Sequence, residues 1–199
     1  MTCSLCPALC ASRSKIVHPT WSPSCKILCL GEAPGADEDM TGEGFVGAAG
    51  KRLDKLLKAH GLVRSIDYGV ANIVRCRPEN NRKPTSQEIA NCLPHLGQFL
   101  VENKPKIIIA VGATAVSIFY GAEQLLRQIE QSRQSSIIDA RLPWMHPALR
   151  PFIAQLGSLT VFPTVHTSGL SWNQKALNGR PWSEIGREQI ALAVAASKA

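Results

Sequence analysis

Four short apolar runs, each almost uninterrupted by polar residues, constrain the fold of this chain more than any other feature of its sequence. They cover residues 26–31, 68–74, 106–111 and 159–165. Strands covered on one face alternate between apolar and polar residues, whereas strands covered on both faces are apolar throughout. The runs therefore predict a parallel sheet that is buried on both sides.

Helical patterns separate these runs and predict the crossovers that a parallel sheet requires. Thr85 and Glu88 have the spacing of a capping box at the start of one of them, and Ser183 is expected to cap the last. Strands that alternate with helices of this length predict an α/β fold with helices on both faces of the sheet. The helices are expected over residues 46–60, 85–103, 113–120 and 183–197, and residues 124–158 show no readable pattern.

Length and composition predict one domain and argue against a membrane span and a signal peptide. A chain of 199 residues with 45% apolar residues suits one domain with a large core. The apolar run over residues 107–122 is shorter than the ~20 residues of a membrane span, so no membrane association is expected. Residues 1–11 lack the basic region of a signal peptide.

The cysteines indicate a metal site. Seven of them lie at positions 3, 6, 10, 25, 29, 76 and 92, and none lies in the second half of the chain. This distribution fits an intracellular metal or iron–sulfur site better than a disulfide framework. Cys3 with Cys6 and Cys76 with Cys92 form two pairs that suit four-thiolate binding of zinc or of a [4Fe–4S] cluster. Cys10 is a candidate replacement for one of these ligands.

Unusual residues stand where three of the predicted strands end, and ligands of open parallel sheets bind at these ends. The acidic, glycine-rich segment 31–39 is either a tight connection with solvated carboxylates or a site that orients water beside a developing cation. It has neither the Walker spacing nor the dinucleotide fingerprint. Asn72 either makes a structural hydrogen bond or presents its amide to a nucleobase edge. His166 is either structural or part of a site.

Basic residues follow the second predicted strand. The net charge of +7 is typical of proteins that meet phosphates. The basic residues are therefore either phosphate contacts or a solvated loop. They are Arg75, Arg77, Arg82 and Lys83.

Taken together, these segments resemble the family 4 uracil-DNA glycosylases. The similarity keeps the order and spacing of the family from the N-terminus to residue 169. It rests on Cys3-x-x-Cys6-Pro7 with Arg13 following, and on residues 31–57, 72–92 and 161–169. It implies a three-layer α/β/α fold with a central four-stranded parallel sheet. It also implies a single domain over residues 1–199, with a cluster-binding segment at about residues 1–25.

The resemblance further implies a cofactor and a set of site residues. The cofactor is a [4Fe–4S] cluster held by Cys3, Cys6, Cys76 and Cys92. Hydrolysis of the N-glycosidic bond develops positive charge on the sugar and negative charge on the base, so acidic groups and a donor to uracil O2 belong in the site. A flipped base also needs an aromatic ring to stack on and an amide that reads its edge. The implied catalytic residues are Glu32, Glu38 and His166, and the implied substrate-binding residues are Ala33, Phe45, Asn72 and Ser168.

The function implied by the resemblance is excision of uracil from DNA, leaving an abasic site. The three strand-end motifs contain no lysine for a Schiff base, so the enzyme is expected to be monofunctional. The implied partner is uracil-containing DNA, single- or double-stranded, met by a monomer in the cytoplasm at the nucleoid. Two alternatives stay open: a glycosylase for another deaminated or damaged base, and a non-catalytic iron–sulfur protein that binds DNA. The third motif also differs from the usual His-Pro-Ser of the family, because Thr167 replaces its proline.

Overall fold

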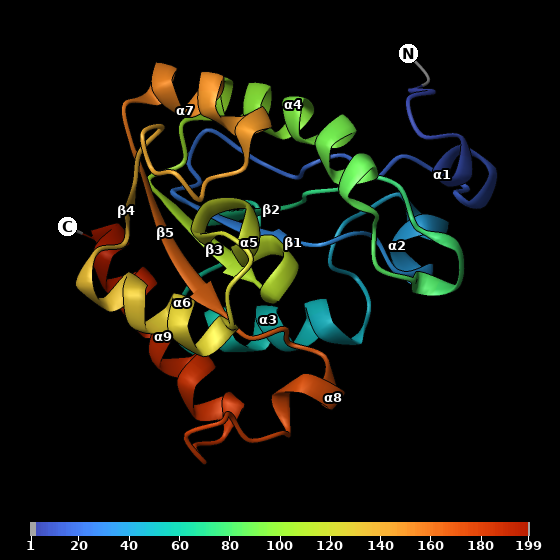
Figure 1. Cartoon of the computed structure of the whole chain (residues 1–199). Helices are drawn as coiled ribbons and strands as arrows, with labels where there is room; N and C mark the ends of the chain where they lie inside the picture. Colours follow the sequence, from blue (N-terminus) through green and yellow to red (C-terminus); the bar gives the residue numbers. More distant parts are fainter. Residues whose placement is uncertain (1–2, 199) are drawn as a thin grey trace.

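The computed structural model describes residues 3–198 and shows a five-stranded sheet between two layers of helices (Figure 1). Four strands are parallel in the order β2-β1-β3-β5, and β4 pairs antiparallel with β5 at one edge. The α/β class and the four parallel strands confirm the prediction, while β4 is an addition whose two residues are too few to form a pattern. The strands are β1 (Ile27–Gly31), β2 (Tyr68–Asn72), β3 (Ile107–Val111), β4 (Ile137–Ile138) and β5 (Leu159–Thr164).

Alternate residues of each parallel strand enter two separate cores. In β1, Leu28 and Leu30 pack on one face of the sheet, whereas Ile27 and Cys29 pack on the other. All four are at most 1% exposed. Full burial of one such aliphatic side chain contributes about 1.5–3 kcal/mol, so apolar residues are favoured at consecutive positions.

Helices cover both faces of the sheet, as Figure 1 shows. The first face is covered by α4 (Ser86–Asn103), α5 (Ala113–Tyr120) and α7 (Arg150–Leu156). The second face is covered by α3 (Ala48–Lys58) and α9 (Trp182–Lys198). The other helical segments are α1 (Pro7–Ser12), α2 (Ala36–Thr41), α6 (Leu125–Gln134) and α8 (Gly169–Trp172), with short 3₁₀ turns η1 (Glu79–Asn81) and η2 (Pro147–Leu149).

Two predicted helix starts have different outcomes. The capping box of α4 is confirmed, because the Glu88 N–H donates to Thr85 Oγ1 at 3.2 Å and the Thr85 N–H donates to Glu88 Oε2 at 2.7 Å. The predicted cap at Ser183 is wrong, since α9 begins one residue earlier at Trp182. The carbonyl of Pro181 already accepts the N–H groups of Glu184 and Ile185, which places Ser183 inside the first turn.

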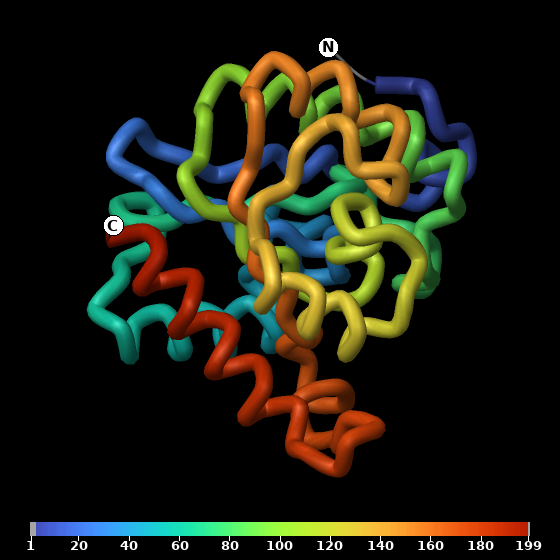
Figure 2. Tube along the Cα trace, turned by 60° about the vertical axis from the view of Figure 1, so that its left-hand side comes forward, coloured from blue at the N-terminus to red at the C-terminus, as the bar shows by residue number. Residues whose placement is uncertain are grey.

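The strand order fixes where a ligand can bind. The chain passes from β1 outward to β2 on one side, and to β3 and β5 on the other, so the order reverses beside β1. Loops leaving the carboxyl ends of strands on either side of such a reversal diverge and open a crevice between them. Figure 2 shows the segment that follows β5, in orange and red, extending away from the layers. Among residues 3–198, no helix combines the length and apolarity that crossing a bilayer requires.

Candidate active site

A hollow of about 720 Å³ lies at the carboxyl ends of β1, β2 and β5, closed on one side by the start of α3. The reversal of strand order beside β1 produces this crevice. All of the predicted catalytic and substrate-binding residues line it, although they come from segments distant in the sequence. They are Glu32, Ala33, Glu38, Phe45, Asn72, His166 and Ser168.

Glu32 is held by its backbone, which leaves its carboxylate available to the hollow. The β1–β2 ladder continues past the strand ends, because the carbonyls of Gly31 and Glu32 accept the N–H groups of Ile73 and Val74 at 2.9 and 3.0 Å. The Glu32 carboxylate lies close enough to His166 to influence its pKa. The two side chains therefore face the same space from opposite sides of the sheet reversal.

His166 is held as a neutral hydrogen-bond donor. The Ser168 N–H donates to its Nδ1 at 3.2 Å, which leaves the proton on Nε2. Desolvation by the surrounding protein lowers the pKa of His166 although the residue is exposed, and the Glu32 carboxylate opposes this shift. Because His166 lines the hollow, the Nε2–H of its neutral imidazole can donate to an oxygen there that gains negative charge.

The side chains of Asn72 and Phe45 both lie next to Gly31. Asn72 ends β2 and is only 8% exposed. A Cβ placed on Gly31 would lie 2.5 Å from Asn72 Oδ1 and 2.7 Å from Phe45 Cζ. Only glycine leaves room at this position, so an amide edge and an aromatic ring can approach one flat ligand together.

The backbone of Phe45 is strained and braced by an arginine that the sequence patterns did not single out. Phe45 has a φ of 58°, a conformation that costs a non-glycine residue about 1–3 kcal/mol. Arg64 Nη1 donates to the Phe45 carbonyl at 3.1 Å, and Arg64 Nη2 donates to the Gly44 carbonyl. Asp54 lies 3.5 Å from this guanidinium and accepts the Tyr68 hydroxyl at 2.8 Å. Arg64 lies outside every recognisable motif, and its only sequence signal is a basic residue just before a strand.

Glu38, which the resemblance implies to be catalytic, has both carboxylate oxygens in hydrogen bonds with the backbone. Its Oε2 accepts the Gly35 N–H at 2.9 Å, and its Oε1 accepts the Gly47 N–H at 2.8 Å. The neighbouring Asp39 is 3% exposed and accepts the N–H groups of Ser14 and Lys15 at 2.9 and 3.2 Å. Both carboxylates therefore fix loops, whereas Glu32, which also lines the hollow, lies near His166.

The candidate phosphate contacts after β2 are not equivalent. The Arg82 guanidinium donates to both oxygens of Glu88, at 2.8 and 2.6 Å, although it also lines the hollow, so a phosphate contact there stays a prediction. A guanidinium in a bidentate pair with a buried carboxylate has few donors left. Arg77 Nε bonds Asn81 Oδ1 at 2.8 Å, which leaves its terminal nitrogens, and Lys83 is exposed.

The Arg82–Glu88 pair predicts a defined loss of stability in acid. Arg82 lowers the pKa of Glu88 to about 2, so the stabilisation is complete above the ordinary glutamate pKa and disappears as the pH falls toward 2. Glu88→Gln is expected to lower the free energy of unfolding by about 1–3 kcal/mol at pH 7, discounted for the partly exposed Arg82. Urea titrations between pH 7 and pH 2 measure the difference, with Glu79→Gln in the same loop as control. If the two proteins differed in free energy of unfolding as much at pH 2.5 as at pH 7, the lowered pKa of Glu88 would be contradicted.

The four predicted cysteine ligands lie on segments that pack together. Arg13 Nη1 donates to Cys76 Sγ at 3.0 Å and its Nη2 to the Cys3 carbonyl at 2.6 Å, so one side chain joins both segments. Asn91 Nδ2 lies 3.5 Å from Cys6 Sγ, and the next residue is Cys92. Burial raises the pKa values of the Cys76 and Cys92 thiols. Figure 2 shows the blue N-terminal segment beside the green loop after β2.

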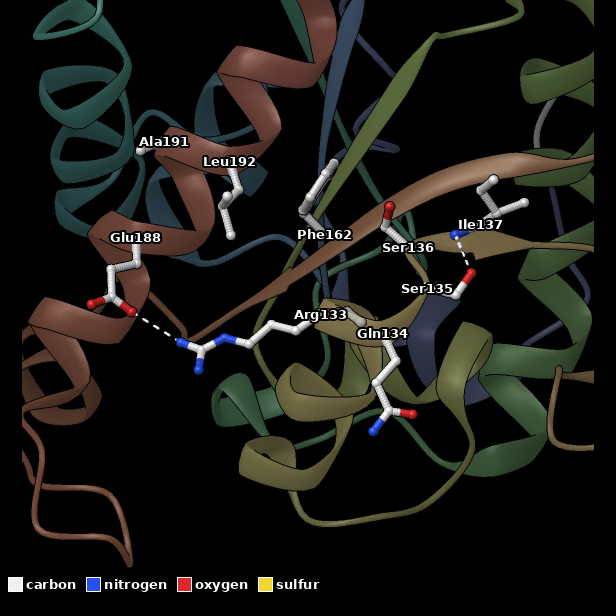
Figure 3. A pocket seen from close by; sticks show the side chains of 10 residues that line it. Arg133, Gln134, Ser135, Ser136, Ile137, Phe162, Glu188, Ala191 and Leu192 are labelled. Atoms are coloured by element: carbon white, nitrogen blue, oxygen red, sulfur yellow. Dashed lines mark hydrogen bonds and ion pairs between the residues drawn. The ribbon is translucent and has the colours of Figure 1, made fainter.

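A second hollow, of about 860 Å³, lies between α6, β4 and α9 over the middle of β5 (Figure 3). Ile137, Phe162 and Leu192 form its apolar lining. Its charged residues neutralise one another, since Arg133 Nη2 lies 3.0 Å from Glu188 Oε2. The hollow at the strand ends is therefore the better candidate for an active site, because an acid, an amide, an aromatic ring and a neutral histidine converge there.

Comparison with known proteins shows the family of this chain. The family model described as the uracil DNA glycosylase superfamily matches residues 18–188. A type-4 uracil-DNA glycosylase of Thermotoga maritima is 36% identical over 176 residues, which cover 86% of this chain and 79% of that protein. The type-4 enzyme of Sulfurisphaera tokodaii is 34% identical over 163 residues, covering 81% and 68%, and that of Pyrobaculum aerophilum is 44% identical over 110 residues, covering 55% of each. The chain belongs to the uracil-DNA glycosylase superfamily and, within it, to the type-4 family.

Proposed function

We propose that this protein is a monofunctional uracil-DNA glycosylase that flips uracil out of DNA and hydrolyses its N-glycosidic bond, leaving an abasic site. The observation that carries this proposal is the convergence of Glu32, Phe45, Asn72 and His166 on one hollow. Its substrate is uracil-containing DNA, single- or double-stranded. We further propose that a single domain acts as a monomer in the cytoplasm, at the nucleoid, where such DNA is found.

The roles of the residues follow from the charges that develop during the reaction. His166 Nε2–H donates to uracil O2 and stabilises the departing uracilate, as preorganised donors do at other oxyanions. Glu32 orients the attacking water and favours the cationic sugar, while Ala33 lines the same wall. Phe45 stacks on the base and Asn72 pairs with its O4 and N3–H.

Two further residues act by holding the site together. Glu38 fixes the loops around Gly35 and Gly47 through its two backbone hydrogen bonds. The Ser168 N–H sets the tautomer of His166. The Ser168 hydroxyl caps α8 by accepting the Ser171 N–H at 3.5 Å. Both side chains line the hollow and limit the space for the sugar.

A strand-cleavage assay tests the proposal. The protein is incubated with uracil-containing oligonucleotides, single- and double-stranded, and abasic sites are then cleaved with alkali. We expect cleavage only at uracil and only after alkali. Cleavage at hypoxanthine, xanthine or ethenocytosine instead would assign a different base, and binding without cleavage would leave a non-catalytic DNA-binding protein.

We also propose a [4Fe–4S] cluster held by Cys3, Cys6, Cys76 and Cys92. Among the described residues, no three His, Cys, Asp or Glu side chains gather around a single point as one metal ion would require. A cubane cluster has a different requirement, because each thiolate binds a different iron. Four free cysteines on adjoining segments, with Arg13 beside Cys76, fit this donor set. When bound, the cluster would supply iron–thiolate bonds that cross-link the N-terminal segment to the loop after β2 and to α4.

The cluster proposal predicts a coloured protein. Anaerobically purified protein is expected to be brown, with broad absorption near ~400 nm and iron in elemental analysis. Cys76→Ala is expected to remove the colour and lower the melting temperature, because a cross-link between distant segments is lost. Cys29→Ser is the control, since Cys29 lies in β1 and is 0% exposed. Zinc without iron in the anaerobic preparation would refute the cluster.

A further inference from the structure

The segment that carries His166 is not held by regular secondary structure. β5 ends at Thr164 and α8 begins at Gly169, so residues 165–168 lie between strand and helix. Thr167 is nevertheless 0% exposed, while the adjacent His166 lines the hollow. A completely buried hydroxyl requires a partner, and the identity of that partner shows what fixes the segment.

Thr167 is bound twice to α3, a helix more than a hundred residues earlier in the chain. Its Oγ1 donates to the Ala49 carbonyl at 2.8 Å. Its own carbonyl accepts a hydrogen bond from Arg52 Nη1. The side chain and the backbone of one residue are thus both held by the first two turns of the same helix. The proline of the usual family motif has no hydroxyl and could not make the first of these bonds.

α3 is a rigid support for such contacts. Leu53 and Leu57 are 0% exposed and lie in the core that α3 and α9 form against the sheet. The same helix contributes Ala48, Ala49 and Gly50 to the wall of the hollow. Any residue fixed to α3 is therefore fixed relative to the hollow as well.

We propose that Arg52 and Thr167 form a latch that positions His166, setting where its Nε2–H points during the reaction. This inference rests on the proposed glycosylase function. Neither residue is among the described residues that line the hollow, so both act through His166 and not on the base. A misplacement of about 1 Å at a reacting group can lower a rate by ~10²-fold, which makes such a support kinetically important.

The hydroxyl of Thr167 provides the first test. Thr167→Val removes the donor and keeps the shape, and is expected to lower kcat for uracil excision about 10- to 100-fold with KM within about twofold. Thr167→Ser retains the hydroxyl and is expected to restore most of the rate. Thr160→Val, the same change near the amino end of β5, is the matched control and should leave kcat unchanged. Equal kcat values for the valine and serine variants would overturn the latch.

A double mutant separates positioning from general stability. If the latch acts through His166, Thr167→Val should produce no further loss in a His166→Ala background, because the group it positions is gone. If Thr167 only stabilises the fold, the two losses should multiply and the melting temperature should fall in both backgrounds. Multiplicative losses would therefore refute the proposal even if Thr167→Val folds poorly.

Arg52 provides a second, independent test of the proposal. Arg52→Gln is expected to lower kcat by about the same factor as Thr167→Val while leaving the salt dependence of DNA binding unchanged. If Arg52 instead contacts a phosphate, its loss would raise KM and reduce the slope of log K against log salt by about 1, with kcat intact, which would refute the latch. Absence of uracil excision by the unmodified protein would refute the glycosylase itself. Wild-type excision that is insensitive to both latch residues would refute only this inference.

Discussion

Replacing His166 with alanine is expected to lower the rate of uracil excision by ~10²–10³-fold, or about 3–4 kcal/mol of transition-state stabilisation. The Nε2–H is fixed by the bond from the Ser168 N–H to Nδ1, so it donates more strongly as charge moves onto the departing base. The interaction acts mainly in the transition state and should change kcat rather than DNA affinity. Single-turnover kinetics and binding to DNA with an uncleavable uracil analogue measure the two separately.

His60→Ala is the control for this experiment, because His60 is exposed just beyond the end of α3. It should leave rate, binding and melting temperature unchanged. A small rate loss in His166→Ala, together with a lower melting temperature and weaker DNA binding, would show that His166 only supports the turn before α8. Glu32 would then be the principal source of catalysis.

Asn72→Asp is expected to reduce uracil excision by about 10- to 100-fold and to raise any activity on cytosine relative to it. The amide offers one donor and one acceptor, whereas an ionised carboxylate offers only acceptors and would face uracil O4 unfavourably. A buried polar group without a partner costs about 1–3 kcal/mol, and Asn72 is only 8% exposed. Competition assays with paired uracil and cytosine oligonucleotides measure the ratio.

Asn103→Asp provides the matched control, because this amide, at the end of α4, bonds the Phe99 carbonyl at 2.9 Å, away from the hollow. It should not change the preference between bases. Full activity on uracil in Asn72→Ala would show that this residue does not read the base.

The sequence predicts the layers of this protein better than it predicts the forces that hold its site together. Continuous apolar runs identify the four parallel strands, since burial on both faces leaves that pattern, and Thr85 with Glu88 marks the start of α4 correctly. Glu38, predicted to be catalytic, and Arg82, a candidate phosphate contact, both make hydrogen bonds that the sequence does not indicate. Both side chains are engaged by partners that no spacing rule connects to them: the N–H of Gly47 and the carboxylate of Glu88.

Arg64 and Arg52 could not be predicted from the local sequence pattern either, because their partners are also distant in the chain. Arg64 reaches the Phe45 carbonyl and Arg52 reaches the Thr167 carbonyl, across 19 and 115 positions of the chain. A backbone carbonyl is present at every residue, so no particular amino acid marks the place where an arginine will bind. Only the packing of the sheet and its helices decides which carbonyl is within reach.

The six-residue helix α2 connects the segment proposed to hold the cluster with the hollow at the strand ends. Glu38 grips the loops around the hollow, and Asp39, the next residue, grips the backbone of Ser14 and Lys15, just behind the cysteine-bearing N-terminus. Oxidative damage that loosened the N-terminus would therefore release one side of α2 and reach the hollow without touching any residue that contacts DNA. If the proposed cluster is bound there, its loss would disturb the hollow while every catalytic side chain remained chemically intact.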